Sequence, residues 1–257
     1  MQVQARPLGE KTETLDHAIE AIRVRFGSQA LTRVAELPPP LPWPSGTPLD
    51  RLTGIGGLPR GRLTLLTGTG TCGKLTLALS LLARATRDFA HAVVVDPSRQ
   101  FDPWAMLPFE PDLSALTVIT PPSPEAAGEA ASALARAGAG FILLMGEIPE
   151  PWLGPMEAGA SRSGAVVVGV VDAPGRALGH ASSLSLGFSN DGWIYERGQL
   201  VGLNVGAHCT KNKLAPPVGE SELEVRYQIG PKLVLGRPVS DLRRPVHEQM
   251  ACESAAV

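Results

Sequence analysis

The sequence has 257 residues, of which 44% are hydrophobic, and a formal net charge of −2 at pH 7. This length suits one large α/β domain with small additions, and the charge gives no overall basic field that would indicate nucleic-acid binding. The three cysteines show no paired spacing, and neither a signal peptide nor a long apolar run is present. We therefore expect a soluble cytoplasmic protein with no disulfide framework and no membrane span.

The first predicted element is an amphipathic helix over residues 12–27. Thr14 is its candidate N-cap and Gly27 ends it, and apolar residues recur at helical spacing between them. The candidate interface residues on this face are Leu15, Ile19, Ile22 and Phe26. A proline-rich stretch, residues 37–48, then predicts an extended linker. The N-terminal helical arm, residues 1–36, either folds back on its own core or packs on another molecule.

The next region, residues 49–230, alternates short apolar runs with helix-forming segments. Residues 74–88 and 124–138 are predicted helices. Five runs rich in leucine or β-branched residues predict strands buried on both faces: residues 62–68, 91–96, 116–120, 140–146 and 164–172. This strand–helix–strand repetition predicts an α/β fold with a mainly parallel central sheet.

After residue 180 apolar and polar residues alternate. This pattern predicts antiparallel strands and hairpins that extend the sheet, with a turn at Asn190-Asp191-Gly192. From Pro231 onward the chain is polar and contains several prolines. The sequence therefore predicts a flexible C-terminal tail over residues 231–257.

Residues 65–76, LLTGTGTCGKLT, are similar to a phosphate-binding loop. Gly68, Gly73 and Lys74 occupy the positions at which backbone N–H groups and an ammonium meet phosphate, but Leu75 stands where a hydroxyl ligates magnesium. Thr76 lies one residue further on, about 100° round a helix, so we expect it to point elsewhere. Weak binding of ATP or ADP, or of a simple anion, remains open.

Five stretches in chain order resemble the bacterial recombinase family RecA: residues 23–36, 49–68, 93–105, 133–147 and 208–230. The resemblance runs from about residue 12 to 230. It implies a RecA-like P-loop core behind an N-terminal arm. We expect no counterpart of that family's C-terminal domain.

The resemblance also implies which residues should hydrolyse ATP, and three of these positions differ. Leu75 replaces the hydroxyl that binds magnesium, Ser98 replaces the glutamate that activates water, and Gly146 replaces the Walker B aspartate. Glu147 is adjacent, but neighbouring residues of a strand face opposite ways. Because each loss removes a different part of the chemistry, we expect no significant ATPase activity, no catalytic residue and no metal site.

Further residues match binding positions of the family. Asp102 matches a residue near the adenine pocket, where the stacking position is Ala105 and Trp104 is adjacent. Lys211 and Lys213 match lysines that reach across a subunit interface toward the neighbour's nucleotide; two solvated lysines in a turn are the alternative.

Two segments correspond to the loops with which the family contacts single-stranded DNA. Residues 147–163 are short for that role, and residues 173–183 keep Arg176 and His180 but carry no aromatic residue for stacking on bases. We therefore expect weak binding of single-stranded DNA at most.

RecA-like chains that are short and lack catalytic residues resemble the ImuA family. That resemblance implies a non-catalytic accessory role in the SOS response to DNA damage and in translesion synthesis, with an ImuB-like polymerase homologue and RecA as partners and self-association as a further option. The tail residues Arg237, Arg243 and Arg244 are candidates for a protein partner or DNA. The alternatives are a nucleotide-binding switch or weak ATPase that acts on single-stranded DNA in recombinational repair, and a DNA-binding adaptor.

Overall fold

The structure is a computed structural model that describes residues 8–27, 41–216 and 220–227. The chain divides into two units, Met1–Leu41 and Pro42–Val257. The predicted tail, residues 231–257, lies outside the described residues, and so do Arg237, Arg243 and Arg244. None of the described helices is both long enough and apolar enough to span a membrane.

The first unit contains the helix α1, Leu8–Phe26. It begins before the predicted start at residue 12, so Thr14 lies inside the helix and the prediction that it caps the helix was wrong. Gly27 ends the helix as predicted: its φ is +89° and its N–H donates to the carbonyl of Arg23 at 2.9 Å. Of the candidate interface residues, Ile19 is half-buried, Ile22 and Phe26 are exposed, and the side chain of Leu15 lies outside the described part.

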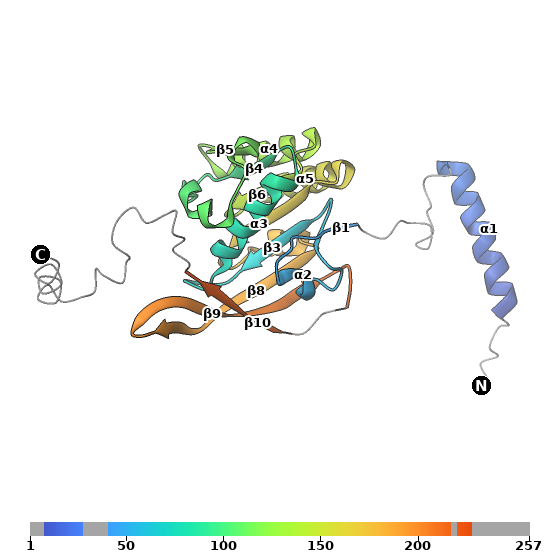
Figure 1. Ribbon diagram of the computed structural model, residues 1–257. Helices are drawn as coiled ribbons and strands as arrows, with labels where there is room; N and C mark the ends of the chain where they lie inside the picture. The colour runs from blue at the N-terminus through green and yellow to red at the C-terminus, as the bar shows by residue number, and fades with distance from the viewer. Residues whose placement is uncertain (1–7, 28–40, 217–219, 228–257) are drawn as a thin grey trace, which may run out of the picture. The chain divides into compact units, whose positions relative to one another are not determined.

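The second unit is built on an eight-stranded sheet with the order β10-β9-β8-β3-β7-β6-β4-β5. Its strands are β3 Leu63–Thr67, β4 Ala92–Val95, β5 Leu116–Ile119, β6 Phe141–Met145, β7 Val166–Val171, β8 Leu184–Glu196, β9 Gln199–Asn212 and β10 Ser221–Arg226. The strands from β8 to β5 run parallel, and β9 and β10 add antiparallel strands at one side (Figure 1). This confirms the predicted fold class, an α/β fold with a mainly parallel sheet extended by antiparallel strands.

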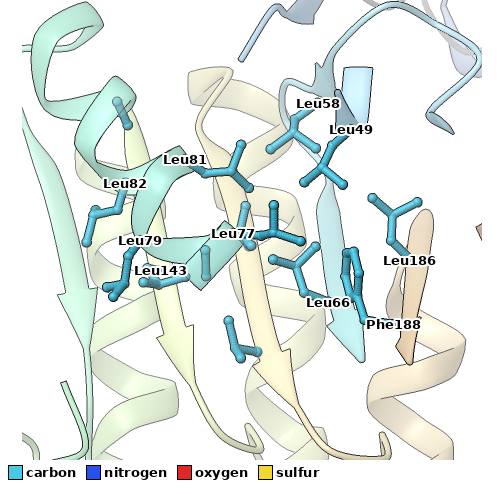
Figure 2. Close-up of a cluster of buried hydrophobic side chains, with 14 of the residues drawn as sticks. Leu49, Leu58, Leu66, Leu77, Leu79, Leu81, Leu82, Leu143, Leu186 and Phe188 are labelled. Carbon is cyan, nitrogen blue, oxygen red and sulfur yellow. The ribbon is translucent and has the colours of Figure 1, made fainter. Parts of the chain in front are cut away.

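Helices cover both faces of this sheet. The longer ones are α3 Lys74–Asp88, α4 Pro124–Ala137 and α5 Glu150–Ser163; the short ones are α2 Leu49–Leu52, α6 Arg176–Ala181, and the 3₁₀ helices η3 Pro103–Phe109 and η4 Leu113–Ala115. Alternate residues of a strand point to opposite faces, so two hydrophobic clusters form. One packs α3 against side chains such as Leu66 and Leu143 (Figure 2), and the other packs α4 and α5 against Leu65 and Ile142.

The structure places β5 at the edge of the sheet. The prediction that all five strand runs are buried on both faces was therefore wrong for residues 116–120. β5 pairs with β4 alone, and Val118 is 44% exposed. An edge strand has a neighbour on one side only, so its side chains are less covered than those of the central strands.

The predicted turn at Asn190-Asp191-Gly192 was also wrong, because these residues lie inside β8. The register shifts there, so that Asn190 and Gly192 face consecutive residues of β9 and Asp191 is the extra residue of a bulge. The hairpin turn comes later, at Arg197 and Gly198, which both have positive φ. Turn-forming residues bend this long strand pair and do not end it. β8 also pairs parallel with β3, so only its β9 side is antiparallel as predicted.

The second unit begins inside the predicted linker. Pro42–Trp43 forms β1, which pairs with β2, Leu58–Pro59. Trp43 is 2% exposed, packs against Phe89 and Phe141, and donates from Nε1 to Asp88 at 2.9 Å. The linker predicted over residues 37–48 was therefore too long at its C-terminal end, because burial of this indole anchors the proline-rich chain to the core.

Candidate functional site

The glycine-rich loop connects β3 to α3 at the carboxyl edge of the parallel strands. Gly68 has φ +152°, and a Cβ there would collide with the carbonyl oxygen of Phe188 and lie 2.7 Å from Cys72 Sγ. Gly73 has φ +79° and a Cβ would lie 2.9 Å from Val205. Both positions therefore require glycine. Gly68 and Gly73 lie in the loop between β3 and α3, Lys74 begins α3, and Lys74 contacts Gly68.

A cavity of about 740 Å³ opens beside this loop. Residues that follow several parallel strands border it, as is usual for ligand sites in open α/β sheets, and its volume lies in the range typical of small-molecule sites. It is bordered by Gly70–Thr76 from the loop and α3, by Pro97, Ser98 and Gln100 after β4, by Pro124, by Met145, Gly146 and Glu147 at the end of β6, by Val170–Ala173 at the end of β7, and by Leu203 and Tyr227.

Lys74 is already bound within its own chain. Its Nζ donates to the carbonyl of Gly68 at 2.6 Å and to Oδ1 of Asp172 at 2.7 Å. The lysine side chain is 12% exposed and that of Asp172 is 70% exposed. Asp172 is not among the site residues predicted from the sequence. The signal that points to it is its place directly after the buried strand β7, at the same sheet edge as the loop.

The first turn of α3 borders the cavity with both Leu75 and Thr76. Leu75 is exposed. It places an apolar side chain at the position where a phosphate-binding loop usually carries a hydroxyl. Thr76 was expected to point elsewhere, but it is half-buried and belongs to the lining, because the cavity extends around this turn.

Ser98 is bound to the aspartate that precedes it. Asp96 is buried, and its Oδ1 accepts from the N–H of Ser98 at 3.1 Å and from the Ser98 hydroxyl at 2.8 Å. Its Oδ2 accepts from the N–H of Phe101 at 2.7 Å. Asp96 therefore shapes the turn after β4, and the Ser98 hydroxyl serves that turn.

Gly146 ends β6 in a backbone conformation that suits glycine. Its φ is +108°, and its N–H donates to the carbonyl of Val170 at 3.1 Å. A Cβ added there would meet no atom within 4 Å, so the backbone and not crowding favours glycine. Glu147 also borders the cavity, and its Oε1 accepts from the N–H of Gly175 at 2.7 Å.

Asp102 does not join this cavity. Its Oδ1 accepts from the N–H of Trp104 at 2.9 Å, which caps the 3₁₀ helix η3. Both side chains are exposed, and neither residue is among those that border the cavity. The structure therefore separates Asp102 from the other candidate nucleotide-binding residues.

Lys211 and Lys213 hold the C-terminal end of α6. Lys211 Nζ donates to the carbonyls of Gly179 and His180, and Lys213 Nζ donates to the carbonyl of His180 at 2.8 Å. Burial, followed by the charge of Lys213, lowers the pKa of Lys211. Lys211 lies in β9, so the alternative of two solvated lysines in a turn does not describe it. Ammonium groups at this end of a helix complement the free carbonyls of its last turn.

Helices occupy much of the two segments in which the resemblance led us to expect DNA-binding loops. Residues 147–163 contain α5, and residues 173–183 contain α6. Arg176 and His180 border a groove of about 890 Å³ between the two helices, together with Glu150 and Glu157. The two acidic residues come from α5 and the two basic ones from α6, and no Phe, Tyr or Trp borders this groove.

The described residues hold no group of three or more His, Cys, Asp or Glu side chains arranged to bind a metal ion. At the loop itself, Leu75 and Gly146 supply no oxygen ligand from their side chains.

Residues 13–149 match the family model of the RecA N-terminal domain. The chain is 31% identical over 263 residues to Protein RecA of Thermus aquaticus, an alignment that covers 86% of this chain and 77% of that protein. It is 30% identical over 275 residues to Protein RecA of Thermus thermophilus, covering 90% and 79%. It is 29% identical over 265 residues to that of Aquifex pyrophilus, covering 87% and 76%.

Proposed function

Because this chain belongs to the RecA family, we propose that it is a non-catalytic, ImuA-like member that serves the DNA-damage response. In this role it supports translesion synthesis within the SOS response. It acts through protein–protein contacts with an ImuB-like polymerase homologue and with RecA, and it does not turn over ATP.

The proposal rests on the residues present in the loop and at the strand ends around it. Leu75, Ser98 and Gly146 stand where hydrolysis requires a hydroxyl, a carboxylate base and a Walker B aspartate. Two of the three fit their present surroundings: the Ser98 hydroxyl donates to Asp96, and Gly146 has φ +108°. Loss of any one such group costs orders of magnitude in rate, so loss of all three leaves no effective route to hydrolysis.

The interaction part of the proposal rests on the arm. Ile22 and Phe26 are exposed on α1, and apolar side chains on an exposed helix face favour packing on another protein. A RecA-type arm makes a heterologous contact, which either extends a filament or ends it. Binding to an active RecA filament and self-association both use this kind of contact. Single-stranded DNA binding is a minor activity, since the groove between α5 and α6 has mixed charge.

Phosphate release by the full chain, in the presence of magnesium and single-stranded DNA, tests the catalytic part. We expect wild type to release no more phosphate than Lys74→Ala. Arg162→Ala removes an exposed charge from α5, outside the cavity lining, and is the matched control. Magnesium-dependent turnover that persists in Arg162→Ala and disappears in Lys74→Ala would show that the chain is an ATPase.

Affinity capture from DNA-damaged cells tests the interaction part. The arm variant is Ile22→Glu with Phe26→Glu, and His17→Glu on the opposite side of the same helix is its control. We expect the arm variant to lose a RecA-like partner, and replacement of Arg237, Arg243 and Arg244 by alanine to lose a polymerase-like partner. If both variants retain every partner of wild type, neither the arm nor the tail is the interaction surface.

A nucleotide-binding switch or weak ATPase that acts on single-stranded DNA is the second candidate. The preserved loop backbone and the adjoining cavity favour it, because they offer space and N–H donors for a phosphate. Titration with a fluorescent ATP analogue, with and without magnesium, separates the two candidates. Tight metal-dependent binding favours the switch.

A further inference from the structure

The charges around the cavity do not match the shape of its loop. Among the residues that the structure describes, the charged ones that border the cavity are Lys74, Glu147 and Asp172. Two carboxylates and one ammonium give this lining a net negative charge. Polyphosphate sites need the opposite, because several negative oxygens require positive charge or a cation to balance them. The backbone of the loop therefore suits an anion, and the side chains around it do not.

Asp172 is fixed beside the loop by its backbone as well as by its carboxylate. The N–H of Gly68 donates to the carbonyl of Asp172 at 3.0 Å, so the end of β7 is tied to the start of the loop. The N–H of Gly175 donates to Glu147 at 2.7 Å, which holds the following segment next to β6. The backbone of Asp172 is thus held beside the loop, and from this position its carboxylate pairs with Lys74 Nζ at 2.7 Å.

A phosphate that enters the loop competes with this carboxylate for one ammonium. Two of the three donors of Lys74 already serve Gly68 and Asp172. The carboxylate of this ion pair is 70% exposed, and solvent screening weakens such a pair, so a phosphate can displace the carboxylate from Nζ. The displaced carboxylate then lies beside the bound phosphate, and the repulsion grows with the number of charges that the ligand carries.

We propose that Asp172 is an internal counter-ion of the loop lysine and a specificity-determining residue that makes the cavity reject polyphosphates. This inference deepens the proposed function, on which it rests, by adding a reason why nucleoside triphosphates are excluded even though the loop keeps its shape. It concerns binding alone, so its test differs from the phosphate-release assay.

The test measures binding of inorganic phosphate, pyrophosphate and tripolyphosphate to the full chain by calorimetry, at constant ionic strength and with a metal chelator. The variants are wild type, Asp172→Asn, and Asp172→Asn combined with Lys74→Ala. Asparagine keeps the size and the backbone bond and removes the charge. Asp112→Asn is the matched control, because Asp112 is exposed, lies outside the cavity lining and changes the net charge equally.

We expect Asp172→Asn to bind tripolyphosphate about tenfold more tightly than wild type, with a smaller gain for phosphate. The gain should disappear in the double variant and be absent in Asp112→Asn. Equal affinity of wild type and Asp172→Asn overturns the proposal, and so does a gain that survives Lys74→Ala. The same titrations with magnesium add a third contrary outcome: if magnesium gives wild type tight binding that Asp172→Asn lacks, Asp172 is a metal ligand and not a counter-ion.

Discussion

Gly146 and Asp88 show how single residues set the properties of the core. Gly146 keeps a positive φ where β6 ends, with open space around the position of a Cβ. Asp88 ends α3 and accepts hydrogen bonds from Trp43 Nε1 at 2.9 Å and from Arg84 Nε at 2.8 Å. The contribution of Gly146 to stability comes from its backbone conformation, and that of Asp88 comes from the charge of its carboxylate.

Replacement of Gly146 tests the backbone conformation at the end of β6. We expect Gly146→Ala to lower the free energy of unfolding by about 1 kcal/mol, because a Cβ is strained at positive φ even without a steric clash. Gly179→Ala is the control: Gly179 lies in α6 without positive φ, and its Cβ would meet Pro174 at an ordinary 3.7 Å. Urea denaturation measures both. A neutral Gly146→Ala would show that the strand end relaxes.

Asp88→Asn tests the hydrogen bond that joins Trp43 of β1 to the end of α3. Burial raises the pKa of the Asp88 carboxyl, but hydrogen bonds from Arg84 and Trp43 outweigh it and lower the pKa overall. A lowered pKa means that the carboxylate stabilises the fold above about pH 4, its ordinary range, and that this contribution disappears as the pH falls through the lower folded value.

We therefore expect Asp88→Asn to lower the free energy of unfolding at pH 7 by about 1–2 kcal/mol, because it weakens hydrogen bonds to a charged acceptor. The difference from wild type should shrink below pH 4. Glu129→Gln, on the exposed side of α4, is the control and should have little effect at either pH. A penalty that is independent of pH would show that shape and not charge matters at this position.

At the scale of elements, α6 depends on β9 for its position. α6 is a short helix, and Lys211 and Lys213 donate to the carbonyls of its last turn. Side chains of a neighbouring strand thus satisfy carbonyls that a helix of this length leaves unpaired. Within this chain the two lysines therefore have a structural role.

Lys211→Met tests this support. We expect it to lower the free energy of unfolding by about 1 kcal/mol and to speed hydrogen exchange of α6 amides, because methionine keeps the apolar stem and removes the donor. Lys213→Met should have a smaller effect, since Lys213 is more exposed. If α6 exchanges at the wild-type rate in both variants, the lysines do not hold the helix.

At the scale of the whole molecule, the sheet and both hydrophobic clusters lie in the second unit. Every strand belongs to residues 42–227 of the described chain, and so does every member of the two clusters. Cooperative unfolding requires disruption of the buried hydrophobic core. The main unfolding transition should therefore be that of the second unit.

Deletion of residues 1–41 tests whether the arm adds to that transition. We expect the melting temperature to change by less than about 2 °C, since β1 and Trp43 remain and the clusters are intact. Calorimetry of the deleted and full chains measures the difference. A fall of several degrees, independent of protein concentration, would support the alternative in which the arm folds back on its own core.

Much of the fold follows from local patterns in the sequence. The helix predicted over residues 74–88 coincides with α3, and the five strand runs match β3 to β7. These elements are predictable because the 3.6-residue and two-residue periods are set by neighbours along the chain. The glycines of the loop were predictable for the same reason, since their spacing alone specifies the turn.

The remaining features depend on residues far apart in the sequence. Sequence alone determined the fold class and the glycine spacing of the loop after β3, and it supplied the expectation, still a prediction, that Leu75, Ser98 and Gly146 depart from a hydrolytic site. Only the tertiary structure decided that β5 is an edge strand, that Asn190-Asp191-Gly192 form a bulge, and that Lys74 pairs with Asp172, 98 positions away. The physical reason is that strand order and ion pairs depend on which strand ends meet in space, and a pattern read along the chain does not contain that information.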